Sequence, residues 1–74
     1  MHGSIKSELG RVIRAERTRR RMTQLDLIAK SGLGRSTILR IESGERDMSI
    51  SQLLAIAAAL NVSPVTILAD ALDE

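Results

Sequence analysis

The sequence of 74 residues contains no cysteine, phenylalanine, tyrosine or tryptophan. Without cysteine, neither a disulfide framework nor a thiolate metal site can form. Without aromatic rings, the core must be aliphatic, and the stacking platforms that most single-strand and RNA-binding modules use are excluded. No apolar run approaches the roughly 18 residues of a membrane span, and the N-terminus lacks the apolar stretch of a signal peptide. These absences predict a cytoplasmic protein with no membrane partner, no bound metal and no cofactor.

The groups that carry catalysis are equally scarce. The chain has one histidine and no cysteine, and it contains neither a glycine-rich phosphate loop nor a cluster of carboxylates. Its length suits a single small domain, 1–74, which as a helical bundle would enclose little concave volume. We therefore expect a protein that is not an enzyme.

Charge is distributed unevenly along the chain, although the net charge is only +2. Residues 1–37 hold nine lysines and arginines against three acids, a balance of +6. Residues 38–74 hold two arginines against six acids, a balance of −4. A basic half of this kind suits a polyanion partner. On charge alone, a solvated helix surface remains the simpler interpretation.

Apolar residues recur three and four apart along the whole chain, which predicts helices and no strands. The helices are expected at about 5–20, 24–31, 35–43, 50–60 and 64–72. The N-caps are predicted to be Ser4, Thr23, Gly34, Ser49 and Ser63, and the helix-ending residues Gly32, Gly44 and Asn61. The residues expected inside are Ile5, Leu9, Val12, Ile13, Leu27, Ile28, Ile38 and Ile41, and the helix at 50–60 is expected to be the most buried. We predict an all-α fold, a compact five-helix domain.

The helices at 24–31 and 35–43 are joined by the short turn "SGLG", an arrangement typical of a helix-turn-helix. In the DNA-binding form of this motif, the second helix enters the major groove and its exposed side chains meet base edges. The exposed flank is expected to carry Arg35, Ser36, Leu39 and Arg40. Arginine can bond guanine through two parallel hydrogen bonds, serine can bond a base or a phosphate, and leucine can meet a thymine methyl. For Leu39, an exposed leucine without a partner is the alternative.

The segment "TQLDLIAKSGLGRSTILRIESGER" resembles the helix-turn-helix of the lambda-repressor-type family, also called the Xre or Cro-repressor type. The resemblance extends over nearly the whole chain, from "LGRVIRAERTRRRMTQ" to "LNVSPVTIL". It implies a lambda-repressor-like fold. It also implies a sequence-specific regulator of transcription, typically a repressor, whose partner is a double-stranded DNA operator.

The resemblance assigns roles to individual positions. Arg35 and Ser36 match the first two base-reading positions of the family, Thr37 follows them, and Arg40 matches a later one. Gln24 matches a glutamine that bonds a phosphate and braces the second helix of the motif. The residues expected at DNA phosphates are Thr23, Gln24, Ser43, Arg46 and Arg21. For Arg21, which follows Arg19 and Arg20, a solvated helix end is the alternative.

Arg17 and Glu42 match two family positions that form a buried ion pair between the first and third helices, so we expect a structural role for them. Two places depart from the family pattern. Ile28 stands where the family usually keeps a small residue, which suggests a wider helix crossing. Glu45 and Asp47 occupy a loop that is often basic, and these acids would weaken phosphate contacts there.

The helix at 64–72 carries more apolar surface than one core contact requires. Ile67 and Ala71 lie on one side of it, and Val65, Leu68 and Leu72 lie on another. Because members of the resembled family often dimerise near this helix, we expect the second group to form a homodimer interface. A tighter core contact is the alternative.

A rival hypothesis is a protein-binding module, because the resemblance extends to antitoxins and coactivators that use this fold to hold another protein. RNA polymerase is a further partner to consider, through an acid such as Glu42 or Glu45. A phage repressor, a restriction–modification controller and a chromosomal regulator are all compatible with the pattern.

Overall fold

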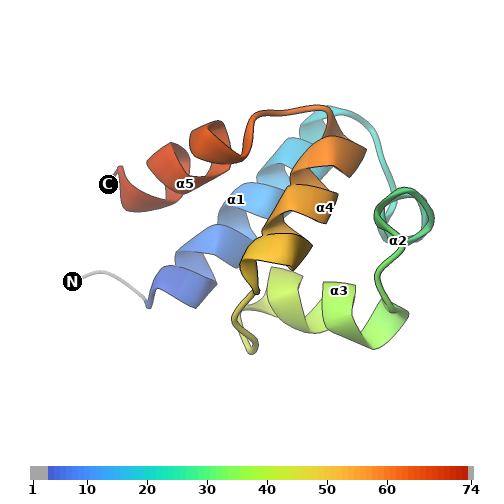
Figure 1. Cartoon of the computed structure of the whole chain (residues 1–74), viewed down its shortest axis with the longest axis horizontal. Helices are drawn as coiled ribbons and strands as arrows, with labels where there is room; N and C mark the ends of the chain where they lie inside the picture. The colour runs from blue at the N-terminus through green and yellow to red at the C-terminus, as the bar shows by residue number, and fades with distance from the viewer. Residues whose placement is uncertain (1–3, 74) are drawn as a thin grey trace.

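The structure is a computed structural model that describes residues 4–73, and these residues form five helices and no strands (Figure 1). The helices are α1 (Ile5–Arg19), α2 (Gln24–Ser31), α3 (Arg35–Ser43), α4 (Ile50–Leu60) and α5 (Pro64–Leu72). The predicted all-α, five-helix fold is confirmed. Only the end of α1 differs, by one residue, because Arg20 is its C-cap.

Local hydrogen bonds explain where the helices begin and end. Thr23 caps α2 and Ser49 caps α4, and each forms a capping box with the side chain three residues later. Gly32 and Gly44 end α2 and α3 in the left-handed conformation, with φ of 73° and 81°. Pro64 occupies the first position of α5, where its missing N–H costs nothing.

The helices pack around one aliphatic core. α1 lies against both α3 and α5, while α2 lies against α3 and α4. In Figure 1, α4 crosses in front of α1, α5 lies at the upper left, and α3 forms the lower edge. The fully buried large side chains are Ile13, Leu27, Ile38, Ile41, Ile56, Leu60 and Ile67. Because α3 contributes Ile38 and Ile41 to this core, its position is fixed from behind.

Some burial predictions were wrong. Ile5 is 45% exposed, because the first residue of α1 lies beyond the body of the domain. Ile28 is only half-buried and packs at the edge of the core. The prediction that α4 is the most buried helix is confirmed, because it has the largest share of buried residues of the five, although Ile50 and Leu54 on its other side are exposed. Within residues 4–73 no single helix is long and apolar enough to cross a membrane. Only α4 and α5 taken together reach that length and apolar composition, and they are bent by 107° relative to each other.

Candidate nucleic-acid interface

α3 presents one polar face to the outside of the molecule. Ser36, Arg40 and Ser43 are all exposed, and their spacing of four and three residues places them on one side of the helix. Ile38 and Ile41 lie on the opposite side and are no more than 1% exposed. The outward face of α3 therefore carries two hydroxyls and one guanidinium on a helix that the core holds rigidly.

The other predicted base-reading residues lie beside this face. Arg35 is the first residue of α3, and its side chain is exposed to solvent. Thr37 and Leu39 are half-buried, because the helical repeat of 3.6 residues turns them partly toward the domain. Leu39 was predicted on the exposed flank, and in the structure only part of its side chain is accessible.

The turn between α2 and α3 contains two glycines, one serine and one leucine. Gly32 ends α2, and Gly34 is the N-cap of α3 in an extended conformation. Between them, the backbone N–H of Leu33 donates to Ser31 Oγ at 3.2 Å, and the Leu33 side chain packs on the core. These contacts fix the direction in which α3 leaves α2.

Glu42 joins α3 to both α1 and α2 from the buried side. Arg17 donates from Nε to Glu42 Oε2 at 2.7 Å and from a terminal nitrogen to Oε1 at 3.1 Å. Gln24 Nε2 donates to the same Oε1 at 3.0 Å, and Arg14 donates to the Glu42 backbone carbonyl at 2.8 Å. Because Glu42 is only 3% exposed, it is not a surface acid that a polymerase could contact.

The start of α2 lies next to this network. Gln24 is half-buried and contacts Glu42, which braces α3, so one of its amide protons is already engaged. Thr23 is exposed, and its hydroxyl oxygen accepts a hydrogen bond from the backbone N–H of Asp26 at 3.0 Å. The hydrogen bonds from the backbone N–H and the side chain of Thr23 lower the pKa of Asp26 below its ordinary value of 3.8.

The other residues predicted at phosphates lie at helix ends. Arg21 is exposed, follows the C-cap of α1, and has φ of 58°, a left-handed conformation that usually selects glycine. Arg46 is exposed in the loop after α3, between Glu45 and Asp47, which are also exposed. Ser43 is exposed, but its hydroxyl donates to the Arg40 carbonyl at 3.1 Å.

The structure shows one buried acid that the sequence analysis missed. Glu16 on α1 is only 4% exposed, and it is paired with Arg19 of the same helix and with Arg20, the C-cap of that helix. The spacing of three and four residues was the available signal for these pairs. Within the run Arg19–Arg21, Arg21 alone makes no ion pair to any residue between 4 and 73.

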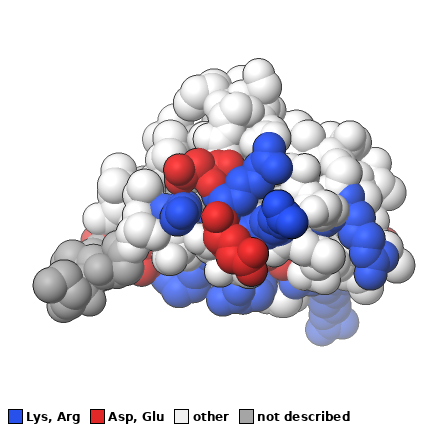
Figure 2. Space-filling model, turned by 90° about the horizontal axis from the view of Figure 1, so that it is seen from below, with Lys and Arg blue, Asp and Glu red and all other residues white. Residues whose placement is uncertain are grey.

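Figure 2 shows the molecule from the side of α3. Basic side chains cross the middle and lower part of this view, acidic side chains lie among them near the centre, and the upper part is uncharged. The side of the molecule that holds α3 is therefore a surface of mixed charge, on which basic side chains outnumber acidic ones in this view.

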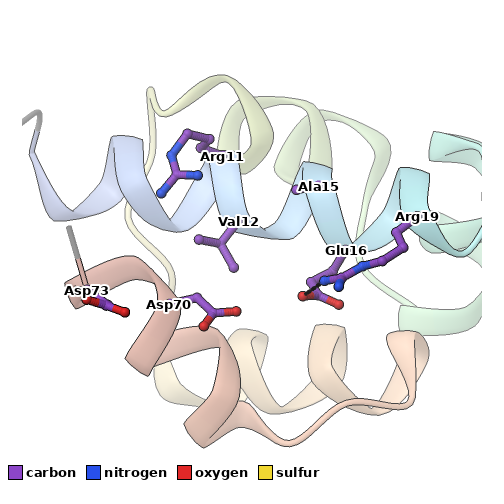
Figure 3. Close-up of a pocket in the computed structure, with 7 residues that line it drawn as sticks. All are labelled: Arg11, Val12, Ala15, Glu16, Arg19, Asp70 and Asp73. Carbon is purple, nitrogen blue, oxygen red and sulfur yellow. Dashed lines mark hydrogen bonds and ion pairs between the residues drawn. The ribbon is translucent and has the colours of Figure 1, made fainter.

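A shallow pocket of about 250 Å³ lies elsewhere, between α1 and α5 (Figure 3). It is lined by Arg11, Val12, Ala15, Glu16, Arg19, Asp70 and Asp73. In Figure 3, Arg19 turns toward Glu16 on one wall, while Asp70 and Asp73 lie on the opposite wall. None of the residues predicted to contact DNA lines this pocket.

Comparison with known proteins gives consistent matches. The sequence model described as "Helix-turn-helix" matches residues 13–67. No curated protein sequence matches the chain. Among solved structures, the restriction-modification controller protein C.AhdI from Aeromonas hydrophila is 32% identical, with a TM-score of 0.81 over 84% of this chain and 94% of that one.

Two further structures are similar. The restriction-modification controller protein C.Esp1396I, in a structure of its tetramer in complex with its natural 35 base-pair operator, is 36% identical. Its TM-score is 0.81 over 89% of this chain and 87% of that one. The clp gene regulator ClgR from C. glutamicum is similar in fold, with a TM-score of 0.89 over 95% of this chain and 91% of that one. Its sequence identity to this chain is 23%.

Proposed function

The chain belongs to the helix-turn-helix family whose model matches residues 13–67, and from this premise we propose that it regulates transcription by inserting α3 into the major groove of a DNA operator. The observation that carries the proposal is the exposed face formed by Ser36, Arg40 and Ser43, backed by the buried Ile38 and Ile41. A groove about 12 Å wide admits one helix, so only an outward, rigid face can meet base edges.

Within this face, Arg40 is the proposed main reader. Its guanidinium can donate two hydrogen bonds to guanine O6 and N7, which no other base offers in the same geometry. Ser36 lies one turn earlier on the same side and can bond a base or a phosphate. The contact with the bases is extended along one edge of the α3 face by Arg35, Thr37 and the accessible part of Leu39. Leu39 would contact a thymine methyl group.

Phosphate contacts at both ends of the motif are proposed to set its register on the duplex. Thr23 is exposed at the start of α2, Gln24 has a second amide proton, and Arg21 is without an ion pair among the described residues. Ser43 and Arg46 are the candidates at the far end of α3. Because Glu45 and Asp47 flank Arg46, we expect the stronger anchoring at the α2 end.

We propose that the regulator acts as a homodimer through Val65, Leu68 and Leu72, which α5 leaves exposed. A two-fold dimer would hold its recognition helices about 34 Å apart, matching half-sites separated by one turn of DNA. The relation to C.Esp1396I, whose structure is a tetramer on its operator, supports association on DNA. Such a protein would act in the cytoplasm by covering an operator and excluding polymerase, with Glu45 as the remaining acid for a polymerase contact.

Selection of bound duplexes from a random pool tests this proposal. We expect one preferred sequence, arranged as a palindrome with half-sites one helical turn apart, and an affinity that falls steeply as salt rises. Enrichment of no sequence would contradict sequence-specific reading. An affinity that is insensitive to salt would instead favour the rival protein-binding module.

A further inference from the structure

Arg14 of α1 holds the carboxyl-terminal end of α3 by its main chain. The Arg14 guanidinium donates a hydrogen bond to the backbone carbonyl of Glu42 at 2.8 Å. Glu42 stands one residue before the end of α3, and the last four carbonyls of a helix have no partner within it. The carbonyls of Arg40 and Ile41 accept from N–H groups that follow the helix, whereas the carbonyl of Glu42 accepts from a different helix. Because the carboxyl end of a helix carries a partial negative charge, a guanidinium suits this place.

Two neighbours of Arg14 on α1 approach the same end of α3. Gly10 lies one turn earlier and Arg17 three residues later, a spacing that places all three on one side of α1. Gly10 leaves room for the carbonyl oxygens of Ile41 and Glu42. Arg17 binds the Glu42 carboxylate, and the rotatable bonds of that side chain can absorb a small turn of α3. Of these three residues, Arg14 alone donates to the main chain of α3, so its contact lacks that freedom.

The contact lies at the same end of α3 as the proposed main reader. Arg40 precedes Glu42 by two residues, which is about 3 Å along the helix axis. The other end of α3 is fixed by the turn after α2, where Leu33 packs on the core. Reading a base through two parallel hydrogen bonds requires that the guanidinium be placed within about 0.5 Å and 10–20°. A change in the tilt of α3 at its carboxyl end would therefore displace the group that reads.

We propose that Arg14 is a positioning residue for base reading: by holding the Glu42 carbonyl, it sets the tilt of α3 and thereby the place of the Arg40 guanidinium in the groove. This inference rests on the proposed function. It extends that function to a residue of α1 that touches no base and to which the sequence pattern assigned no role.

The exposure of Arg14 separates positioning from stability. Arg14 is exposed and its contact with Glu42 is only partly buried, so water can reach the carbonyl when the guanidinium is removed. The pair of Arg17 with the Glu42 carboxylate differs, because these side chains are only 11% and 3% exposed. Loss of the Arg14 guanidinium should therefore change the direction of α3 more than the stability of the fold.

The test compares the full chains of the parent and of Arg14→Met on two duplexes. One is the selected duplex, and the other has a replacement at the base pair where Arg40→Ala relaxes the preference. The ratio of the two affinities measures discrimination at that base pair. We expect Arg14→Met to lower the ratio about fivefold or more, because a bidentate contact to a base is worth roughly 5- to 150-fold in discrimination. The melting temperature should stay close to that of the parent, and Arg14→Lys, which keeps a donor for the carbonyl, should recover part of the ratio.

Two controls isolate the positioning of Arg40. Arg11→Met removes the same charge from the same helix, at an exposed arginine that pairs with Glu8, and should leave the ratio unchanged. Arg14→Met is also made in the Arg40→Ala background, where it should have no further effect on the ratio, since no guanidinium remains to be positioned. A further loss in that background would contradict the inference.

Three other results would overturn the inference. The first is a folded Arg14→Met protein with the ratio of the parent. The second is equal weakening on both duplexes with a smaller dependence on salt, which would make Arg14 a phosphate contact. The third is an Arg14→Met protein that does not fold, as judged by circular dichroism, which would make the contact a requirement of stability. In each case the proposed function stands if the parent prefers the selected duplex, whereas a parent without any preference would contradict the function and this inference together.

Discussion

Gly10 of α1 lies directly against the backbone of Ile41 in α3. A β-carbon on Gly10 would come within 2.4 Å of the Ile41 carbonyl oxygen and within 2.9 Å of the carbonyl oxygen of Glu42. Both atoms belong to the backbone, so no side chain can move aside. The absence of a side chain at Gly10 therefore sets how closely α3 approaches α1, and with it where the polar face of α3 lies.

Gly10→Ala is expected to destabilise the protein. Alanine favours a helix by about 1 kcal/mol over glycine, but forcing α1 and α3 apart should cost more, for a net loss of roughly 1–2 kcal/mol in the free energy of unfolding. Urea denaturation measures this loss. Ser51→Ala, at an exposed position of α4, is the control and should change stability by only a few tenths of a kcal/mol. A Gly10→Ala protein more stable than the parent would disprove the close contact.

The ion pair between Arg17 and Glu42 is expected to act as a unit. Arg17→Met leaves a buried carboxylate without its main partner and should cost about 3–5 kcal/mol, enough to unfold much of a domain this small. The double variant Arg17→Met with Glu42→Leu should recover most of that loss, because no buried charge remains. Thermal denaturation of the single and double variants measures the coupling between the two residues.

The exposed pair Glu8–Arg11 provides the control for this cycle. Arg11 is 54% exposed, so Arg11→Met should cost at most about 1 kcal/mol. If Arg17→Met were no more harmful than Arg11→Met, the buried network would not be holding α3 in place.

Arg21 is expected to lower the stability of the folded protein and to strengthen its binding to DNA. Its left-handed backbone costs roughly 1 kcal/mol relative to glycine, so Arg21→Gly should raise the free energy of unfolding by about that amount. The same change removes a proposed phosphate contact and should weaken binding to the selected duplex. Asn61→Gly is the matched control: Asn61 has φ of 57° at the end of α4, and its replacement should leave DNA binding unchanged. Equal affinity of Arg21→Gly and the parent would remove Arg21 from the interface.

Asp26 is expected to make stability depend on pH. Its pKa is lowered in the folded protein by the hydrogen bonds from Thr23, so the ionised form is the stabilising one. The contribution is complete above the ordinary value of 3.8 and is lost as the pH falls through the lower pKa of the folded state. Asp26→Asn should therefore be less stable than the parent at neutral pH, and the difference should shrink toward zero in strong acid. A difference that stays constant with pH would exclude this role.

The features that the sequence predicted correctly are local ones. The N-cap at Thr23 and the glycine that ends α3 at Gly44 depend on residues within one turn of each other. The inward positions of Ile38 and Ile41 follow from helical periodicity, and the outward position of Arg40 follows from the same periodicity.

The features that it missed depend on tertiary contacts. Nothing in the sequence identifies Gly10 as the point where α1 and α3 touch. A glycine inside a helix can equally be a position that only lowers the stability of the helix, with no close contact behind it. Ile5 follows the apolar repeat of α1, but the domain ends before it. Leu39 is half-buried because its exposure depends on how far α3 is rotated against α1 and α2, which periodicity determines only to within a fraction of a turn.

The central claim is that the outward face of α3 reads base pairs, and Arg40→Ala tests it most directly. Affinities of the parent and the variant are measured for the selected duplex and for duplexes with each half-site base pair replaced in turn. We expect Arg40→Ala to lose about 1–3 kcal/mol of binding free energy and to show a relaxed preference at one base pair. Arg11→Ala, which removes an arginine from α1 away from α3, should change neither quantity. An Arg40→Ala protein that binds every duplex as the parent does would contradict the account.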